Sequence, residues 1–186
     1  MKKALLALAL MLCLCLSAAV AEEATPLPFG VNYSMNWQET YAAAGENAQS
    51  DTWESDEDEV HVGSIYLENV DIGVGTLHAG TVYFEVNDSN SAREGRLYDV
   101  LCLLDEGDNV IASFRDALAQ VSSVYGEPDN DPFDDESVAA YVEYGALSAS
   151  WTKTDVRINL YMQRAYEDSL TLEFSNRLCF DANDLK

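Results

Sequence analysis

Strict alternation between apolar and polar side chains restricts the fold of this chain more than any other feature. A period of two residues is that of a β-strand with one face buried and the other in water. The pattern is clearest over residues 81–86, 156–163 and 170–175, and further strands are expected over 60–70, 96–104 and 138–151. The sequence therefore predicts an antiparallel sheet with one dry face and one wet face.

Two segments have the features of helices that would cover the dry face. Trp37–Ala44 follows Asn36, a good N-cap residue, and Glu39 stands where it completes a capping box. The second segment, Ser113–Tyr125, carries apolar side chains at helical spacing: Phe114, Ala117, Leu118, Val121 and Tyr125. The expected fold class is α+β, with an antiparallel sheet of about six strands and two helices packed on one face.

The order of these elements repeats along the chain. Residues 33–105 are expected to form a helix, an acidic loop and three strands, and residues 109–176 have the same order. Residues 22–32 are expected to be an exposed leader, and residues 177–186 a loosely held tail. We therefore expect a single domain over 33–176, built from two units that share pattern but little residue identity.

The first 21 residues have the three-part layout of a secretory signal peptide. Lys2 and Lys3 precede an apolar run, residues 4–16, that is too short to remain as a membrane span. Ala19 and Ala21 occupy the small positions of a cleavage site. We expect cleavage near Ala21 and a mature protein that is secreted or periplasmic, in the cell envelope, without stable membrane insertion.

The chain is strongly acidic, with a formal net charge of −23 at pH 7. Loss of Lys2 and Lys3 with the signal peptide leaves 8 basic residues against 33 acidic ones, a formal charge of −25. Such a surface repels phosphate backbones and anionic lipid headgroups, so nucleic-acid binding is excluded. The charge favours a soluble protein, expected to be a monomer, with cationic partners or loosely held divalent ions.

Two cysteines, Cys102 and Cys179, remain after signal cleavage. Export permits a disulfide between them, and two unbridged thiols are an equal alternative because the sequence does not show their separation. Cys102 lies in an apolar strand, where a thiol normally packs and does not react.

An acidic segment, residues 129–136, has the composition of a calcium site, since hard cations prefer several oxygen ligands. The candidate ligands are Asp129, Asp131, Asp134 and Asp135, with Glu136 beside them. The spacing is not that of an EF-hand, because the sixth position is not glycine and the twelfth is Ala140. The alternative interpretation is a solvated acidic loop, and no other cofactor is expected.

Carboxylates on strands suggest a second alternative, a hydrolase. Glu85, Glu143 and Glu173 all fall in predicted strands, and a pair of carboxyl groups can catalyse glycoside hydrolysis. Glutamates are also common on wet sheet faces. The sequence contains no G-x-S-x-G elbow and no glycine-rich phosphate loop, so we expect a protein without enzymatic activity.

Aromatic residues on the wet phase of the strands point to binding. Tyr83, Tyr141 and Tyr161 fall on this phase together with Arg157. Tyrosine and arginine are enriched at binding hot spots, and cross-strand pairing of tyrosines is the alternative reading. We expect the polar sheet face to bind another protein or a cell-surface polymer.

Residues around the first predicted helix resemble a known family. Met35-Asn36, Glu39 and Gly45 are similar to the Met-[Ser/Thr]…[Glu/Gln]…Gly-x-Pro signature of SmpA/OmlA-type envelope proteins, although Asn47 replaces the proline and a lipid-anchor cysteine is missing. The segment 125–128, Tyr-Gly-Glu-Pro, is similar in the second unit. The resemblance implies a tandem helix-plus-sheet architecture, shared with β-lactamase-inhibitor-like proteins. It also implies a non-catalytic module that binds protein through one sheet face, and it assigns no specific binding residue.

Overall fold

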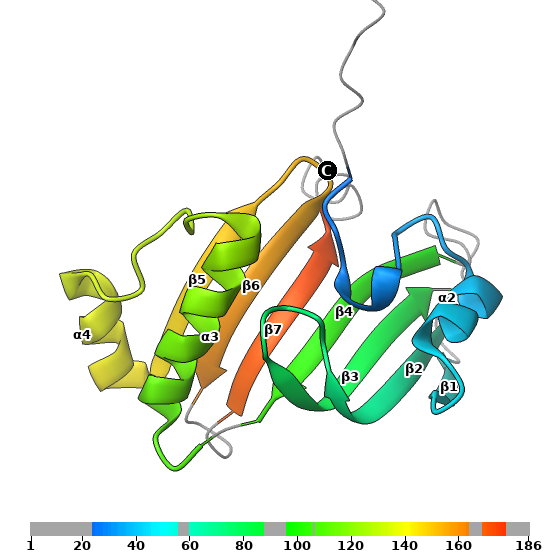
Figure 1. Ribbon diagram of the computed structural model, residues 1–186, viewed down its shortest axis with the longest axis horizontal. Helices are drawn as coiled ribbons and strands as arrows, with labels where there is room; N and C mark the ends of the chain where they lie inside the picture. Colours follow the sequence, from blue (N-terminus) through cyan, green and yellow to red (C-terminus); the bar gives the residue numbers. More distant parts are fainter. Residues whose placement is uncertain (1–23, 56–59, 88–95, 106, 164–168, 178–186) are drawn as a thin grey trace, which may run out of the picture.

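The computed structural model describes residues 24–55, 60–87, 96–105, 107–163 and 169–177. These residues form an α+β fold around one seven-stranded antiparallel sheet, in the order β1-β2-β3-β4-β7-β6-β5 (Figure 1). The strands are β1 (Gln49–Ser55), β2 (Val60–Asp71), β3 (His78–Asn87), β4 (Arg96–Leu104), β5 (Ala146–Thr152), β6 (Val156–Gln163) and β7 (Ser169–Asn176). The first four strands and the last three form two meanders, which join where β4 pairs with β7.

The helical elements lie on one face of this sheet (Figure 1). They are the 3-10 turn η1 (Pro28–Gly30) and the helices α2 (Trp37–Ala44), α3 (Val110–Tyr125) and α4 (Asp135–Tyr144). Helix α3 packs over β6 and β7, α2 packs on β2, and α4 contacts β5. No helix in the described part of the chain is long and apolar enough to cross a membrane.

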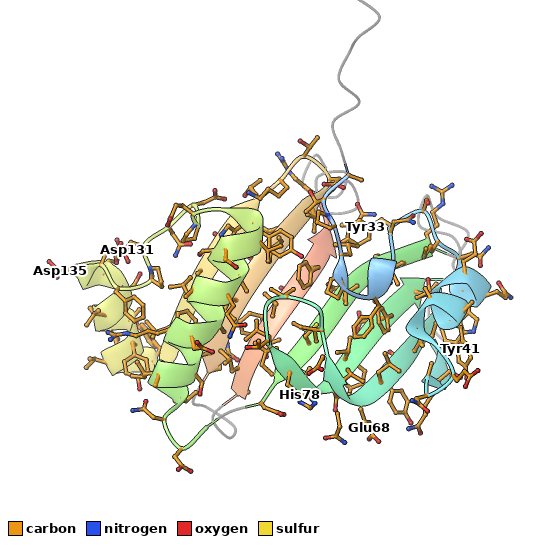
Figure 2. The ribbon with its side chains drawn as sticks, viewed as in Figure 1. Tyr33, Tyr41, Glu68, His78, Asp131 and Asp135 are labelled. Atoms are coloured by element: carbon orange, nitrogen blue, oxygen red, sulfur yellow. The ribbon has the colours of Figure 1, made fainter. Side chains whose placement is uncertain are left out.

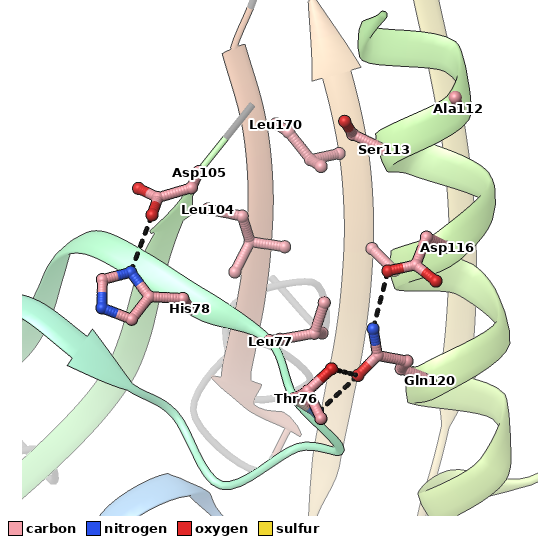
Figure 3. Close-up of a pocket in the computed structure, with 11 residues that line it drawn as sticks. Thr76, Leu77, His78, Leu104, Asp105, Ala112, Ser113, Asp116, Gln120 and Leu170 are labelled. Carbon is pink, nitrogen blue, oxygen red and sulfur yellow. Dashed lines mark hydrogen bonds and ion pairs between the residues drawn. The ribbon is translucent and has the colours of Figure 1, made fainter. Parts of the chain in front are cut away.

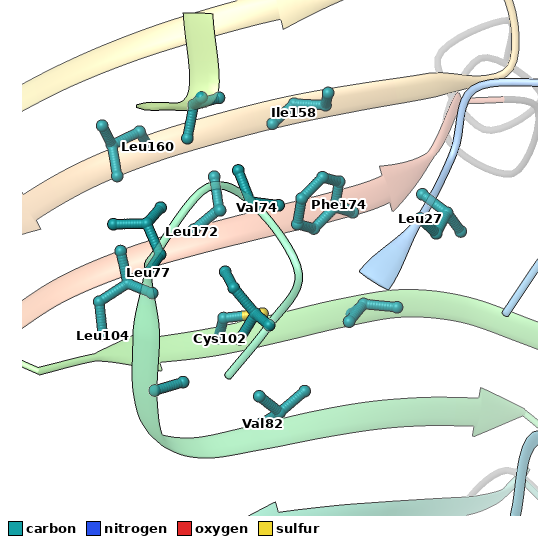
Figure 4. Packing of buried hydrophobic residues seen from close by; sticks show 14 of the residues in the cluster. Leu27, Val74, Leu77, Val82, Cys102, Leu104, Ile158, Leu160, Leu172 and Phe174 are labelled. Carbon is teal, nitrogen blue, oxygen red and sulfur yellow. The ribbon is translucent and has the colours of Figure 1, made fainter. Parts of the chain in front are cut away.

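The apolar phase of the strands points toward the helices and forms the core (Figure 4). Ile158, Leu160 and Leu172 are fully buried, and Leu170 is nearly so. The prediction that alternating strands bury one face beneath helices is therefore confirmed. Burial of a side chain of this size stabilises the fold by about 1.5–3 kcal/mol relative to exposure, so this layer holds the sheet and helices together.

The described residues form seven strands, where the sequence predicts about six. The additional strand, β1, occupies part of the segment predicted as an acidic loop and pairs with β2 from Gln49↔Tyr66 to Ser55↔Val60. β1 is thus an edge strand of the sheet.

The described part of the chain forms three α-helices, where two were predicted, and the expected strand over 138–151 is wrong in its first half. Residues 135–144 form α4, and the strand begins only at Ala146. Local capping explains the helix: the Asp134 side chain accepts a hydrogen bond from Ser137 N at 2.7 Å, and Gly145 ends it in the left-handed conformation, φ 69°.

The other helix predictions hold, with one shifted boundary. Trp37–Ala44 and its capping box are confirmed, because Asn36 and Glu39 exchange backbone-to-side-chain hydrogen bonds of 3.0 Å. Helix α3 begins three residues before the predicted start, since Asn109 accepts a hydrogen bond from Ala112 N at 3.1 Å. The two units consequently agree only in outline, with one α-helix and four strands in the first and two α-helices and three strands in the second.

Candidate binding face

The face of the sheet opposite the helices carries the polar phase of the strands. On β2 and β3 this phase forms three directly opposed pairs, Ser64↔Glu85, Tyr66↔Tyr83 and Glu68↔Thr81. These six residues and Leu101 of β4 line an open hollow of about 480 Å³. The hollow therefore arises from the register of three adjacent strands.

Two tyrosines form the centre of this hollow. The ring centroids of Tyr66 and Tyr83 lie 6.1 Å apart, and the rings are tilted by 40°. The Tyr66 hydroxyl donates a hydrogen bond of 3.1 Å to Gln49 Oε1 at the edge of the sheet, which helps to fix the ring. Both side chains are partly buried, so each ring retains surface that a ligand can contact.

A row of acidic side chains adjoins the hollow. Glu85 of β3 lies opposite Asp99 of β4, and Glu173 of β7 lies on the other side of Asp99. The Tyr98 hydroxyl donates to Glu85 Oε2 at 2.6 Å, and Asn159 Nδ2 donates to Glu173 Oε2 at 2.9 Å. These bonds hold the two outer carboxylates in place.

Asp99 is the most perturbed acid on this face. Asp99 is only 9% exposed. Burial, together with the negative charges of Glu173 and Glu85, raises the pKa of its carboxyl group to about 8. A hydrogen bond to the Glu173 carboxyl group favours the protonated form, and Ser175 Oγ lies 3.4 Å from Asp99 Oδ1. The carboxyl group of Asp99 therefore retains its proton near neutral pH.

The structure brings only part of the predicted binding set onto this face. Tyr83, Arg157 and Tyr161 lie on it, whereas the placement of Tyr141 on a strand is wrong. Tyr141 belongs to α4 and packs against the core. Tyr83 and Tyr161 are three strand spacings apart, about 14 Å, so only Tyr83 of the predicted residues lines the hollow.

Sequence reasoning missed Tyr66, Asp99 and Leu101. Tyr66 lies on the polar phase of β2, but its position opposite Tyr83 depends on the register of two strands. Asp99 lies on this face in the same phase as Leu101 and Leu103, but the apolar run from Val100 to Leu104 shows no alternation that would reveal it. The pairing shift between Glu85 and Val86 also changes the phase of the strand before Asp99, and a two-residue period alone does not locate such a bulge.

Three of the four aspartates predicted to bind calcium accept hydrogen bonds from backbone N–H groups. Asp129 Oδ2 accepts from Thr152 N at 2.7 Å, and Asp131 Oδ1 accepts from Phe133 N at 2.9 Å. The bond from Ser137 N lowers the pKa of Asp134. Asp131 and Asp135 lie near α4 at the outer end of the molecule (Figure 2). Across the described residues, no three His, Cys, Asp or Glu side chains are grouped to hold a metal ion.

A second hollow, of about 400 Å³, lies between α3 and the loop that precedes β3 (Figure 3). The side chain of Gln120 closes it by accepting from Thr76 N at 2.5 Å and donating to Asp116 at 2.7 Å. His78 Nδ1 is paired with Asp105 Oδ2 at 2.7 Å, and its ring points away from Ser113. Ser113 Oγ accepts from Gly107 N, so this group does not form a serine–histidine pair.

The remaining predicted residues lie apart from the binding face. Cys102 is buried on the helix side of β4, between Val82 and Leu172 of the neighbouring strands, and burial raises its pKa (Figure 4). Cys179 lies outside the described residues, so a bridge between the two cysteines stays a prediction. Glu143 is exposed on α4, so it does not join Glu85 and Glu173.

Comparison with known proteins identified no similar family, protein or structure. The chain matches no family model, and no curated protein or solved structure is significantly similar to it.

Proposed function

We propose that this chain is a non-catalytic binding protein that holds a cationic protein partner on the uncovered face of its sheet. The observation that carries the proposal is the difference between the two faces of the sheet. Helices and an apolar core cover one face, and the other presents a tyrosine-lined hollow beside a row of carboxyl groups.

The composition of the uncovered face supports binding over solubility alone. Aromatic and aliphatic side chains, Tyr66, Tyr83 and Leu101, line the hollow, and Leu103 nearby is 37% exposed. Large aromatic side chains with a polar end are typical of binding hot spots. A sheet face adapted only to water does not require them.

The charge of the face supports a basic partner. The carboxyl groups of Glu68 and Glu85 lie beside the tyrosines. Glu173 lies beside Asp99, and the basic residue Arg157 lies two strands from Asp99, on β6. Opposite charges across an interface speed association and exclude wrong partners. The partner surface is therefore rich in lysine or arginine.

We further propose that the protein is exported, with cleavage near Ala21, and that its two units are diverged repeats of the SmpA/OmlA type. The layout of the first 21 residues supports export. The meeting of the last strands of both meanders at β4 and β7 supports two related units.

Affinity capture from the native exoprotein environment tests the binding proposal. The bait is the wild-type protein, a face variant carrying Tyr83→Ala and Tyr161→Ala, or the control Tyr144→Ala, a residue that is 69% exposed on α4. We expect the wild type and the control to retain a basic protein that the face variant loses, with equal melting temperatures. Equal retention by a folded face variant would refute the proposal.

One observation favours a second function, a carboxylate-based hydrolase. A buried acid with a raised pKa between two carboxylates is a common feature of general-acid sites. If Asp99 is such an acid, Asp99→Asn abolishes hydrolysis of oligosaccharide substrates. Detectable hydrolysis by wild type is the first requirement, and its absence across a substrate panel removes this alternative.

A further inference from the structure

We propose that the hollow between Tyr66 and Tyr83 is a subsite for a single arginine side chain of the protein partner. The inference rests on the proposed function and deepens it, because it names the group that the face recognises and the residues that contact it.

The shape of the hollow fits an extended side chain better than an enclosed small molecule. Its floor is the sheet, and its wall residues come from β2, β3 and β4. Its volume of about 480 Å³ is in the range of ligand sites, yet it is open to solvent along the face. A group that remains attached to a partner can therefore enter and leave without a lid.

The tyrosine rings supply the first interaction. The face of a tyrosine ring attracts a cation through its quadrupole, and arginine stacks on aromatic rings more often than lysine does. The Tyr66 and Tyr83 rings are tilted by 40°, so a planar guanidinium that stacks on one ring stays near the other.

The carboxylates supply the second interaction. Glu68 and Glu85 stand at opposite ends of the tyrosine pair, each two residues along its strand from a ring. Glu68 is exposed, and it points outward at the edge of the sheet (Figure 2). A guanidinium on the rings lies between two negative charges, and none of the seven residues that line the hollow is basic.

The aliphatic wall supplies the third interaction. Leu101 lies directly opposite Tyr83 on the neighbouring strand and is partly exposed. The methylene stem of an arginine buries against such a surface while its charged end reaches the carboxylates. A neutral sugar would use the rings but not the charges, which makes a polymer of neutral sugars the weaker fit.

An NMR titration of the protein tests this subsite with a capped pentapeptide, Gly-Gly-Arg-Gly-Gly, at 150 mM salt. The matched probe replaces arginine by citrulline, which has the same shape and no charge. We expect the arginine peptide to change the chemical shifts of Tyr66, Tyr83 and their neighbours. The citrulline peptide should bind at least tenfold more weakly, and Tyr144→Ala should bind the arginine peptide as the wild type does.

Variants of the hollow complete the test. Tyr66→Ala with Glu68→Gln should weaken the arginine peptide at least tenfold, and Tyr66→Phe should retain it because the ring remains. Equal binding of citrulline, preferential binding of cello-oligosaccharides, or shifts spread over all acidic surfaces would overturn the subsite. If the natural partner is lost by the variant with Tyr83→Ala and Tyr161→Ala but kept by the variant with Tyr66→Ala and Glu68→Gln, the binding function stands and the arginine subsite is refuted.

Discussion

The carboxyl group of Asp99 on β4 is hydrogen-bonded to that of Glu173 on β7, on the face of the sheet that the helices leave uncovered. Burial and the neighbouring negative charges of Glu173 and Glu85 disfavour ionisation of Asp99. The acidic face is therefore also the place where the stability of this protein responds to pH.

Stability should fall as pH rises through the neutral range. The pKa of Asp99 is raised from 3.8 to about 8 on folding, so the native state binds more protons than the unfolded state between these values. The free energy of unfolding then decreases with pH, by up to about 1.4 kcal/mol per pH unit for one proton. Urea unfolding at pH 5.5, 6.5, 7.5 and 8.5 measures this slope, and a slope of zero or above contradicts the assignment.

Asp99→Asn should stabilise the protein at pH 7.5 and make its free energy of unfolding depend less on pH. Asparagine keeps the shape of the side chain and donates a hydrogen bond to Glu173 without requiring a proton from solvent. We expect the free energy of unfolding to increase by about 1–3 kcal/mol. The aspartate is ionised in the unfolded chain and must take up a proton to be buried, whereas asparagine is neutral in both states. Asp108→Asn, an exposed position before α3, is the control and should change little.

Gly63→Ala should destabilise the junction of α2 and the sheet. A Cβ atom at position 63 would overlap the ring of Trp37, which lies directly on this glycine. Overpacking of this kind costs about 1–3 kcal/mol. The double variant with Trp37→Leu should recover part of the loss, as a double-mutant cycle in thermal unfolding would show. Additive losses would mean that the two residues do not interact.

Asn109→Ala should weaken the start of α3, the helix that covers β6 and β7. The Asn109 side chain accepts the hydrogen bond from Ala112 N, and loss of such a cap costs about 1 kcal/mol. The neighbouring Asp108→Ala provides the comparison in chemical denaturation. A cost no larger than that of the control would show that the cap does not contribute.

Local patterns were enough to predict several elements. The limits of Arg96–Leu104, Val156–Gln163 and Trp37–Ala44 agree with the sequence prediction because periodicity and capping act within a few residues. Residues 138–144 were misassigned since short apolar runs suit both a helix and a strand, and the cap at Asp134 decided in favour of the helix. Of the binding residues, Tyr83 was found because its strand alternates regularly.

The sequence by itself determined which side of each regular strand is apolar, and hence that a layer of helices covers one face of an antiparallel sheet. Only the tertiary structure decided that Tyr66 stands opposite Tyr83 and that Asp99 is enclosed between Glu85 and Glu173. The physical reason is range: side-chain alternation is a property of one strand, whereas register and a bulge depend on hydrogen bonds between strands distant in the chain.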